Sequence, residues 1–504
     1  MKAKNYVLGV DIGTTATKSV LFSVTGSVLQ QSTLNYPLSS PNPLTAEQNP
    51  EEIFIAVLQT IFSVILESQI DPEEIICLSF SSAMHSLIAV DVEGNLLTQS
   101  LTWADRRGEK WVNLLKEEGR ENELYRLTGI PFHPMSPLIK LVWLRNEYPD
   151  LFYRAAKFIS IKEYIIFQLF DRYLIDTSLA AATGLLNLHT LTWCEEALNI
   201  AGITPDRLSE IVPTTYILPS LNRERAIAVG IPEGIPTVIG SSDGVLANLG
   251  VGAIYPKTIA VTIGTSGAVR TVSDRLQLDE KNKLFCYPLI ENYWIIGGAV
   301  NNGGIVMQWL KENLIELAGV EGYDQLNAIA QTIPAGSEGL IFHPYLTGER
   351  APLWDSHARG SFFGFTLNHT KAHLIRAVLE GIIYNLSIVL LSLEKFTGKS
   401  EKIIASGGFT RSPLLRQMLA DIVNCPVIIP DRQESSCFGA AILGLYALKK
   451  IPTLEIISTT RAKKQQYFPI PENVAIYQKI LPIYQNLLDR FQLEWVKLPS
   501  SFEP

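Results

Sequence analysis

The sequence predicts an α/β protein built of two large domains. Its 504 residues are too many for a single hydrophobic core. Apolar runs that are typical of buried strands, such as 7–12, alternate with segments of helical spacing, such as 50–69. A strand–turn–strand pattern near the start recurs about one domain later, at 257–270. We therefore expect two related halves that face each other across a bound ligand.

The first strand–turn–strand pattern carries an acidic residue and a glycine turn. Asp11 stands where the first strand should end, and Gly13-Thr14-Thr15 follows before a second β-rich run that begins near Lys18. Such a turn exposes backbone N–H groups and hydroxyls that suit a phosphate. Asp11 could hold a metal-bound water beside it, and Lys18 could supply positive charge. The alternative is an ordinary hairpin, because short glycine-rich matches are weak evidence.

Two further glycine turns follow strands. Gly264, Thr265 and Ser266 form the turn of the second copy. Gly407-Gly408 lies between a strand that ends near residue 405 and a helix that begins at Pro413. Turns of this kind allow a flat ring or a phosphate to lie close to the backbone.

A carboxylate on a strand-to-helix corner is a candidate catalytic base. Asp243 follows the strand expected at 235–240 and precedes Gly244 and a helix. The alternative is a helix N-cap, a role that aspartate also suits at this position.

Polar clusters at two other strand ends are candidates for a substrate site. Met84 and His85 follow the strand expected at 75–81, while Trp103 and Asp105 follow a hairpin expected at 87–101. Strand ends of open α/β sheets present ligand-binding groups. A single histidine at such a point is also common in purely structural roles, so both interpretations stay open.

Composition restricts the class of protein. A hydrophobic content of 47% and a charged content of 18% are typical of a soluble globular enzyme. We expect no membrane span and no secretory signal, because the longest apolar runs are short and the chain enters a strand at once. The 5 scattered cysteines are typical of reduced thiols in a cytoplasmic protein. A net charge of −8 argues against nucleic-acid partners.

Taken together, these motifs resemble the FGGY carbohydrate kinases, which belong to the actin-like superfamily. The segment 135–147 fits the first signature of that family, and 360–380 fits the second, with Phe365 in place of a usual aliphatic residue. The resemblance implies two actin-like (ribonuclease H-like) α/β domains, at 1–248 and 249–504, that flank a cleft for nucleotide and substrate. It also implies ATP, Mg²⁺ and a small sugar or sugar acid as ligands.

Within the family, the segments 81–86, 102–105, 133–135 and 300–304 are similar to those of the gluconate kinases. The resemblance therefore implies phosphorylation of gluconate to 6-phosphogluconate. Two alternatives stay open. One is a different substrate, with xylulose first among the pentuloses and polyols, and the other is a non-enzymatic actin-like module that binds nucleotide. The state of assembly also stays open, with a homodimer as one option.

The resemblance also implies roles for individual residues. Asp243 is implied as the general base and Asp11 as the metal site. The residues implied to contact the nucleotide are Gly13, Thr14, Thr15, Lys18, Gly264, Thr265, Ser266, Gly304, Gln308, Gly407, Gly408 and Ser412. Those implied to surround the sugar are Met84, His85, Trp103, Asp105, His133, Met135 and Asp243.

A linear sugar acid needs a cation for its carboxylate. The candidates in the N-terminal half are Arg106, Arg107, Lys140, His85 and His133. Among these we consider the two histidines first, because Lys140 can anchor its helix and the arginine pair can be solvated. We expect Arg350 to tie loops of the cleft together.

Overall fold

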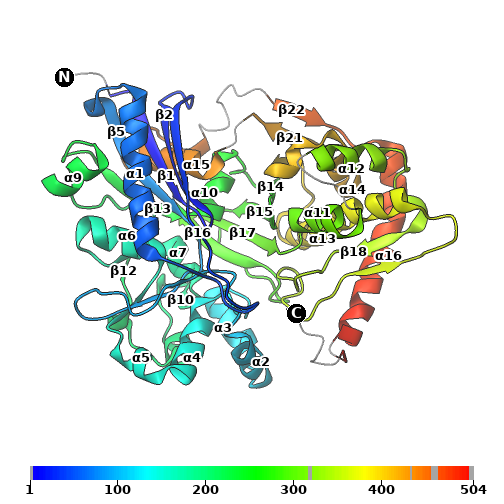
Figure 1. The fold of residues 1–504 in the computed structure, drawn as a ribbon, viewed down its shortest axis with the longest axis horizontal. Coiled ribbons are helices and arrows are strands. Elements are labelled where there is room, and N and C mark those ends of the chain that lie inside the picture. Colours follow the sequence, from blue (N-terminus) through cyan, green and yellow to red (C-terminus); the bar gives the residue numbers. More distant parts are fainter. Residues whose placement is uncertain (1–3, 316–320, 432–433, 456–463, 496, 499–504) are drawn as a thin grey trace.

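A computed structural model of the chain describes residues 4–315, 321–431, 434–455, 464–495 and 497–498. These residues form two lobes, each built around a mixed β-sheet (Figure 1). The first sheet has the strand order β13-β5-β1-β2-β3, and the second has the order β16-β17-β15-β14-β20-β21-β22. The predicted α/β class is confirmed.

The first sheet contains the opening hairpin. β1 (Tyr6–Ile12) pairs antiparallel with β2 (Ala16–Ser23), and β3 (Val28–Asn35) extends this side. On the other side, β5 (Ile75–Ser82) runs parallel to β1, and β13 (Thr237–Ser242) runs parallel to β5. Every residue of β5 is buried, as expected for a central parallel strand that is covered on both faces.

The second sheet repeats this arrangement. β14 (Thr258–Ile263) pairs antiparallel with β15 (Gly267–Ser273), and β17 (Tyr293–Val300) extends this side. β20 (Lys402–Ser406) runs parallel to β14, and β21 (Val427–Pro430) runs parallel to β20. β14 therefore occupies the place that β1 has in the first sheet, and the predicted duplication of strand, glycine turn and strand is confirmed.

Helices and short strands complete both lobes. In chain order the helices are α1 (Pro50–Ser68), α2 (Glu109–Glu117), α3 (Glu121–Thr128), α4 (Pro137–Glu147), α5 (Pro149–Arg154), α6 (Ile161–Phe170), α7 (Thr177–Ala182), α8 (Glu195–Ala201), α9 (Arg223–Val229), α10 (Asp243–Gly250), α11 (Gly304–Trp309), α12 (Glu321–Gln331), α13 (Lys371–Thr397), α14 (Pro413–Val423), α15 (Ser435–Ala447) and α16 (Pro471–Trp495). The remaining strands are β4 (Glu47–Gln48), β6 (Ile88–Val90), β7 (Ser100–Leu101), β8 (Lys157–Ile159), β9 (Leu174–Asp176), β10 (Leu186–Asn187), β11 (Thr192–Trp193), β12 (Glu210–Val212), β16 (Phe285–Ile290), β18 (Ile341–His343), β19 (Ser361–Phe363) and β22 (Lys464–Tyr467).

The hairpin predicted at 87–101 is present in an irregular form. Antiparallel bridges join Leu87 to Leu101 and Val90 to Leu96, and the N–H of Leu97 donates to the carbonyl oxygen of Ala89 at 2.8 Å. Each strand also has a second partner, because β6 pairs with β8 and β7 pairs with β4. These second partners are distant in sequence, and no local pattern indicates them.

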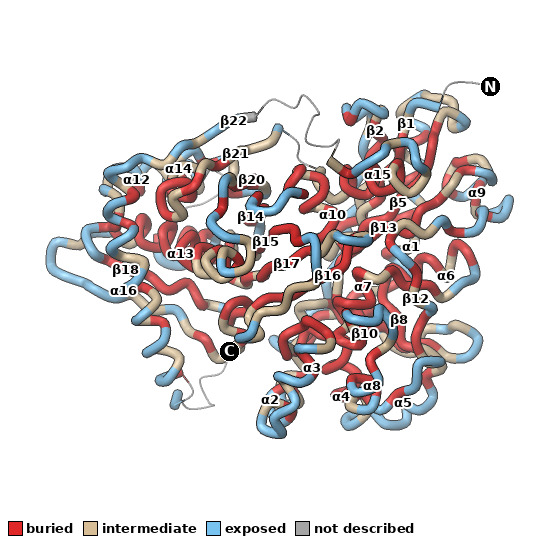
Figure 2. The backbone as a smooth tube through the Cα atoms, turned by 180° about the vertical axis from the view of Figure 1, so that it is seen from behind, coloured by how far each residue is buried: buried red, intermediate tan, exposed pale blue. Residues whose placement is uncertain are grey.

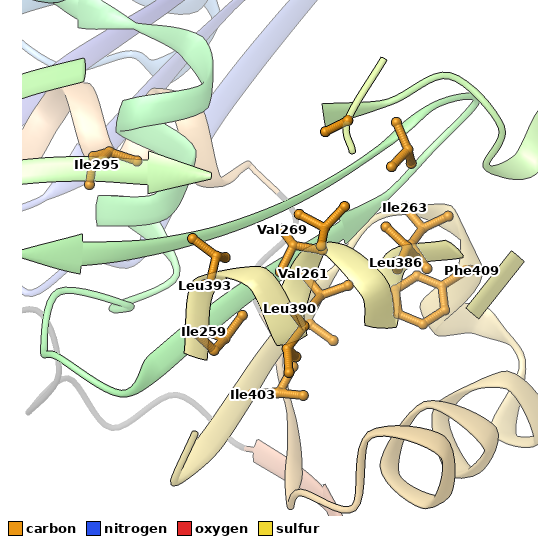
Figure 3. Packing of buried hydrophobic residues seen from close by; sticks show 14 of the residues in the cluster. Ile259, Val261, Ile263, Val269, Ile295, Leu386, Leu390, Leu393, Ile403 and Phe409 are labelled. Carbon is orange, nitrogen blue, oxygen red and sulfur yellow. The ribbon is translucent and has the colours of Figure 1, made fainter. Parts of the chain in front are cut away.

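The second sheet has one packed face and one face toward the first lobe. The packed face is shown in Figure 3, where β14 and β15 contribute Ile259, Val261, Ile263 and Val269, and α13 contributes Leu386, Leu390 and Leu393. Because side chains alternate along a strand, Thr262, Ala268 and Arg270 lie on the opposite face. This alternation determines which residues of the sheet are available for a ligand.

Helix α13 is the one helix of the described ranges that is long and apolar enough to cross a membrane. Its most apolar window is 89% buried inside the protein. In Figure 2 the buried backbone runs through α13 and the strands beside it. Its apolar character is therefore that of a core helix.

Helix α15 joins the two lobes. It lies between β21 and β22 of the second sheet in sequence, but it packs on α10 and on β1 and β5 of the first lobe (Figure 1). A Cβ atom at Gly9 would lie 2.1 Å from the carbonyl oxygen of Cys437, and one at Gly439 would lie 2.0 Å from that of Leu246. The backbones touch directly, so only glycine fits at these two positions.

We expect Gly9→Ala to lower the free energy of unfolding by about 1–3 kcal/mol or more, because the added methyl group must push α15 away from β1. Urea unfolding of the variant and the wild type measures this difference. Gly234→Ala is the matched control, since a Cβ at Gly234 would have no atom within 4 Å. Equal stabilities of the two variants would contradict the contact.

Candidate active site

A cleft of about 290 Å³ lies between the lobes. The first lobe lines it with Thr14, Met84, His85, Trp103, Met135 and Asp243. The second lobe lines it with Thr262, Gly264, Ser266, Gly267, Ala268, Arg270, Phe285, Tyr287, Ala299 and Arg350. Residues from many parts of the predicted site thus come together in one place.

The first glycine turn is held rigidly at this cleft. The N–H of Gly13 donates to the carbonyl oxygen of Ala16 at 3.0 Å, and the Tyr36 hydroxyl donates to the carbonyl oxygen of Gly13 at 2.5 Å. Trp103 Nε1 donates to Thr14 Oγ1 at 3.0 Å. Trp103 therefore links the predicted sugar site to the predicted phosphate loop.

Asp11 is half-buried at the end of β1. Ser81 Oγ donates to Asp11 Oδ1 at 2.6 Å. Burial raises the pKa of Asp11 to about 7, and the nearby Asp243 carboxylate adds to this rise. Lys18 lies opposite Asp11 on β2, but its Nζ forms an ion pair with Glu434 Oε2 at 3.0 Å. The charge of Lys18 is thus partly balanced by Glu434, the N-cap of α15, and the Asp11 and Asp243 carboxylates are close enough to affect each other.

The second and third glycine turns pack on each other. The N–H of Gly304 donates to the carbonyl oxygen of Gly264 at 2.7 Å, so the start of α11 rests on the second turn. Gly407 has a φ of 100°, and a Cβ there would lie 2.3 Å from the carbonyl oxygen of Ile263. A Cβ at Gly408 would meet no atom within 4 Å. These contacts place three of the predicted nucleotide segments side by side.

The other predicted nucleotide residues differ in exposure. Thr15 and Thr265 are exposed at the tips of their turns, and Ser266 lines the cleft. Gln308 is exposed on α11, where its Nε2 donates to Glu312 Oε1 at 3.1 Å.

Ser412 is the N-cap of α14. Its Oγ accepts a hydrogen bond from the N–H of Leu415 at 3.2 Å and donates to Asn327 Oδ1 at 2.9 Å. The hydroxyl therefore caps the helix, and the contact of Ser412 with adenosine stays a prediction.

Asp243 is the first residue of α10. The N-cap is Ser242, so the alternative role of Asp243 as the N-cap is not supported. Asp243 Oδ1 accepts a hydrogen bond from the N–H of Gly244 at 2.6 Å. Burial raises the pKa of the Asp243 carboxyl, although Arg270 and Arg350 favour its charged form. The carboxylate faces the cleft beside the second glycine turn.

The two candidate histidines are neutral. His85 Nδ1 donates to the carbonyl oxygen of Ala182 at 2.8 Å, and burial and Lys140 lower its pKa to about 3. His133 Nδ1 accepts from the N–H of Met135 at 3.1 Å, and burial lowers its pKa well below the usual value. Burial thus favours the neutral imidazole at both positions, and a neutral imidazole brings no positive charge to a carboxylate, so the structure gives no support for either histidine as the cation.

The other candidate cations have partners within the protein. Lys140 Nζ donates to three backbone carbonyl oxygens and is fully buried. Arg106 pairs with Glu109 at 3.0 Å, and Arg107 pairs with Asp105 at 2.7 Å. Asp105 is 1% exposed and also accepts a backbone N–H. Asp105 and His133 are not among the residues that line the cleft, which differs from the prediction for both.

Arg350 ties the cleft loops together, as expected, and it also lines the cleft. Its Nε donates to Asn301 Oδ1 at 2.7 Å, and its Nη2 donates to the carbonyl oxygen of Val300 at 3.2 Å. The guanidinium lies over the ring of Trp103, 4.8 Å from the ring centroid. Because Trp103 belongs to the first lobe, this cation–π contact connects the two lobes.

Sequence reasoning missed Arg270, Phe285 and Tyr287, which line the cleft from the second lobe. A signal was present for Arg270, because Ser266, Ala268 and Arg270 alternate directly after the second glycine turn. Phe285 and Tyr287 lie on β16, far from any recognised motif, and no local pattern indicates them.

Family models match both lobes. The model described as the N-terminal domain of the FGGY family of carbohydrate kinases matches residues 6–250, and the model for its C-terminal domain matches residues 259–448. The chain belongs to the FGGY family of carbohydrate kinases. Like other FGGY kinases it has two actin-like domains, each built on one of the two sheets. The division of the chain at residues 248 and 249 stays a prediction.

Full-length relatives support the membership in the FGGY family. A gluconokinase of Bacillus subtilis is 52% identical over 491 residues, which cover 96% of this chain and 95% of that protein. A solved structure of gluconate kinase from Lactobacillus acidophilus is 42% identical, with a TM-score of 0.93 over 98% of this chain and 99% of that one. A ligand-bound xylulose kinase from the same organism is 41% identical, with the same TM-score and coverage.

Proposed function

We propose that this FGGY kinase transfers the γ-phosphoryl group of ATP to the primary hydroxyl of gluconate and so forms 6-phosphogluconate. The observation that carries the proposal is the position of the Asp243 carboxylate, which lies in the interlobe cleft beside Gly264 and Ser266. The gluconokinase of Bacillus subtilis, which matches nearly the whole chain, supports gluconate as the acceptor.

Asp243 acts as the general base in this proposal. Phosphoryl transfer requires an acceptor hydroxyl in line with the leaving group, a base for its proton, and positive charge around the phosphoryl oxygens. An ionised Asp243 accepts the hydroxyl proton as the oxygen attacks phosphorus. The contact between Arg350 and Trp103 favours closure of the cleft. Closure excludes water, which would otherwise accept the phosphoryl group in place of the sugar acid.

The glycine turns and Asp11 would hold the nucleotide and its metal ion. Backbone N–H groups at the turns suit phosphate oxygens. No cluster of three or more His, Cys, Asp or Glu side chains in the described ranges could hold a metal ion alone. Asp11 still fits Mg²⁺, because this ion is usually bound by one or two carboxylates together with substrate phosphates. When bound, Mg²⁺ neutralises charge on the phosphates.

A coupled assay of ADP release over a set of acceptors tests the substrate. We expect gluconate to give the highest kcat/KM among gluconate, xylulose, ribulose, glycerol and fuculose. A xylulose preference is the main alternative, because one similar structure is a xylulose kinase. ATP turnover without any dependence on an acceptor would instead favour a nucleotide-binding module.

The fall of kcat/KM at low pH measures the pKa of the proposed general base, Asp243. We expect kcat/KM for gluconate to fall with an apparent pKa above the ordinary aspartate value, because burial raises the pKa of Asp243. Arg270 and Arg350 oppose this rise, and the Asp243 carboxylate in turn raises the pKa of nearby Asp11. Activity is present above the raised pKa and is lost as the pH falls through it, since the base must be ionised. An acid limb at the ordinary aspartate value would contradict the assignment.

We also infer a cytoplasmic location. It is supported by the five cysteines, which are all free and buried: Cys77, Cys194, Cys286, Cys425 and Cys437.

A homodimer stays a prediction, and the molecular mass in solution tests it.

A further inference from the structure

The cleft contains an arginine that forms no ion pair with any of the residues that the structure describes. Arg270 lies on β15 and lines the cleft. Its Nε is buried without a hydrogen-bond partner, and within the described residues its guanidinium forms no ion pair. Asp243 is its nearest source of opposite charge, but it does not reach ion-pair distance. A partly buried cation without a partner is costly, so a ligand is the expected partner.

Two glycines make room for this side chain. A Cβ at Gly297, which is paired with Arg270 on β17, would lie 2.9 Å from Arg270 Cγ. A Cβ at Gly244 would lie 2.9 Å from Arg270 Nη2. The stem of Arg270 therefore lies over Gly297, and its head lies beside the start of α10. The absence of a side chain at Gly297 and Gly244 leaves the space that the Arg270 side chain occupies in the cleft.

Small residues separate Arg270 from the second glycine turn. Ser266, Ala268 and Arg270 line the cleft, and Ala299 is paired with Ala268 on the neighbouring strand. With a rise of about 3.4 Å per residue, the Cα of Arg270 lies about 14 Å along the strand from that of Ser266. The alanines leave space for the carbon chain of an acceptor between the phosphate loop and the arginine.

The chemistry of the cleft then matches a hydroxy acid. Asp243 provides a proton acceptor for a hydroxyl, and Arg270 provides planar donors for a carboxylate. The cations considered from the sequence are neutral, as for His85 and His133, or have partners within the protein, as for Lys140. Arg350 adds a second positive charge near Arg270, while two of its nitrogens donate to protein oxygens.

We propose that Arg270 binds the carboxylate of the sugar acid and so distinguishes gluconate from uncharged polyols and ketoses. This assignment rests on the proposed function, because it names the group that recognises the anionic end of gluconate. A contact with the transferred phosphoryl group is the competing role for Arg270, and the two roles predict different measurements.

Titration calorimetry of gluconate binding in the absence of nucleotide distinguishes a carboxylate contact of Arg270 from a phosphoryl contact. We expect Arg270→Met to weaken gluconate binding by about 10²- to 10³-fold, because a buried charged partner is lost. Arg270→Lys should recover part of this loss. The loss of affinity for gluconate in Arg270→Met should exceed any change in its affinity for ATP. Unchanged gluconate affinity together with slower ATP hydrolysis would assign Arg270 to the phosphoryl group and overturn the proposal.

Stability and a matched control complete the test. Arg270→Met should keep or raise the melting temperature, since it removes a partly buried charge that has no ion pair among the described residues, whereas a structural role predicts a lower value. Arg275→Met is the control, because Arg275 is exposed in the loop after the same strand. If the wild type does not bind gluconate, the proposed function itself fails. If the wild type binds gluconate and Arg270→Met binds it equally well, only the assignment of Arg270 fails.

Discussion

Replacing Asp243 with asparagine is expected to lower kcat by about 10²- to 10⁴-fold, the usual contribution of a general base. Asparagine has nearly the same shape, but its amide cannot accept the proton of the attacking hydroxyl. The fold should persist, because Ser242 and not Asp243 is the N-cap of α10. Release of ADP with saturating gluconate measures the loss of turnover, and titration with ATP shows whether nucleotide binding is retained.

Asp274→Asn is the matched control for this variant. Asp274 is an exposed aspartate that lies four residues after Arg270, outside the lining of the cleft. We expect its kcat to equal that of the wild type. Near-normal kcat in Asp243→Asn would remove Asp243 from the role of base. Equal losses of turnover and of nucleotide binding would indicate that the variant disturbs the cleft as a whole.

Replacing Glu349 with glutamine is expected to lower the free energy of unfolding by about 3–5 kcal/mol, as when one member of a buried charged set is removed. Glu349 is fully buried. Its carboxylate accepts four N–H donors, from the backbones of Asn301 and Arg350 and from the side chains of Asn302 and Asn385. A glutamine amide presents its own N–H groups to some of these donors, and they then lose their acceptor.

Urea unfolding measures the stability of Glu349→Gln. The variant should also raise KM for gluconate, because Glu349 holds the backbone of Arg350, which lines the cleft, and of Asn301, to which the Arg350 guanidinium donates. Glu291→Gln is the control, since Glu291 is exposed in the turn between β16 and β17. A stability equal to that of the control would show that the four hydrogen bonds contribute little.

The sequence indicated the nucleotide side of the site better than the sugar side. Gly13, Gly264 and Gly407 are parts of local strand–turn patterns, and local patterns follow from backbone geometry that neighbouring residues determine. Asp243 was recognisable for the same reason, as a carboxylate at a corner between a strand and a helix. The sugar side depends on side chains that long-range pairing brings together, such as Arg270 and Phe285 across Gly297.

The charge states at the sugar side show why sequence reasoning was insufficient there. His85 has the residue type of a cation, but burial makes it neutral. Arg107 has a permanent charge, but Asp105 and Glu47 neutralise it. Whether a side chain is free to bind a ligand depends on its burial and its partners, which are properties of the tertiary structure.

By itself, the sequence determined the α/β class, the duplicated hairpins with their glycine turns, and the corner that carries Asp243. These features depend on strand periodicity and turn chemistry within a few residues of chain. Only the tertiary structure decided that β6 pairs with β8, that α15 joins the lobes through Gly9, and that Arg270 lies in the cleft without an ion pair among the described residues. Contacts between distant segments set burial and charge compensation, and no local pattern encodes them.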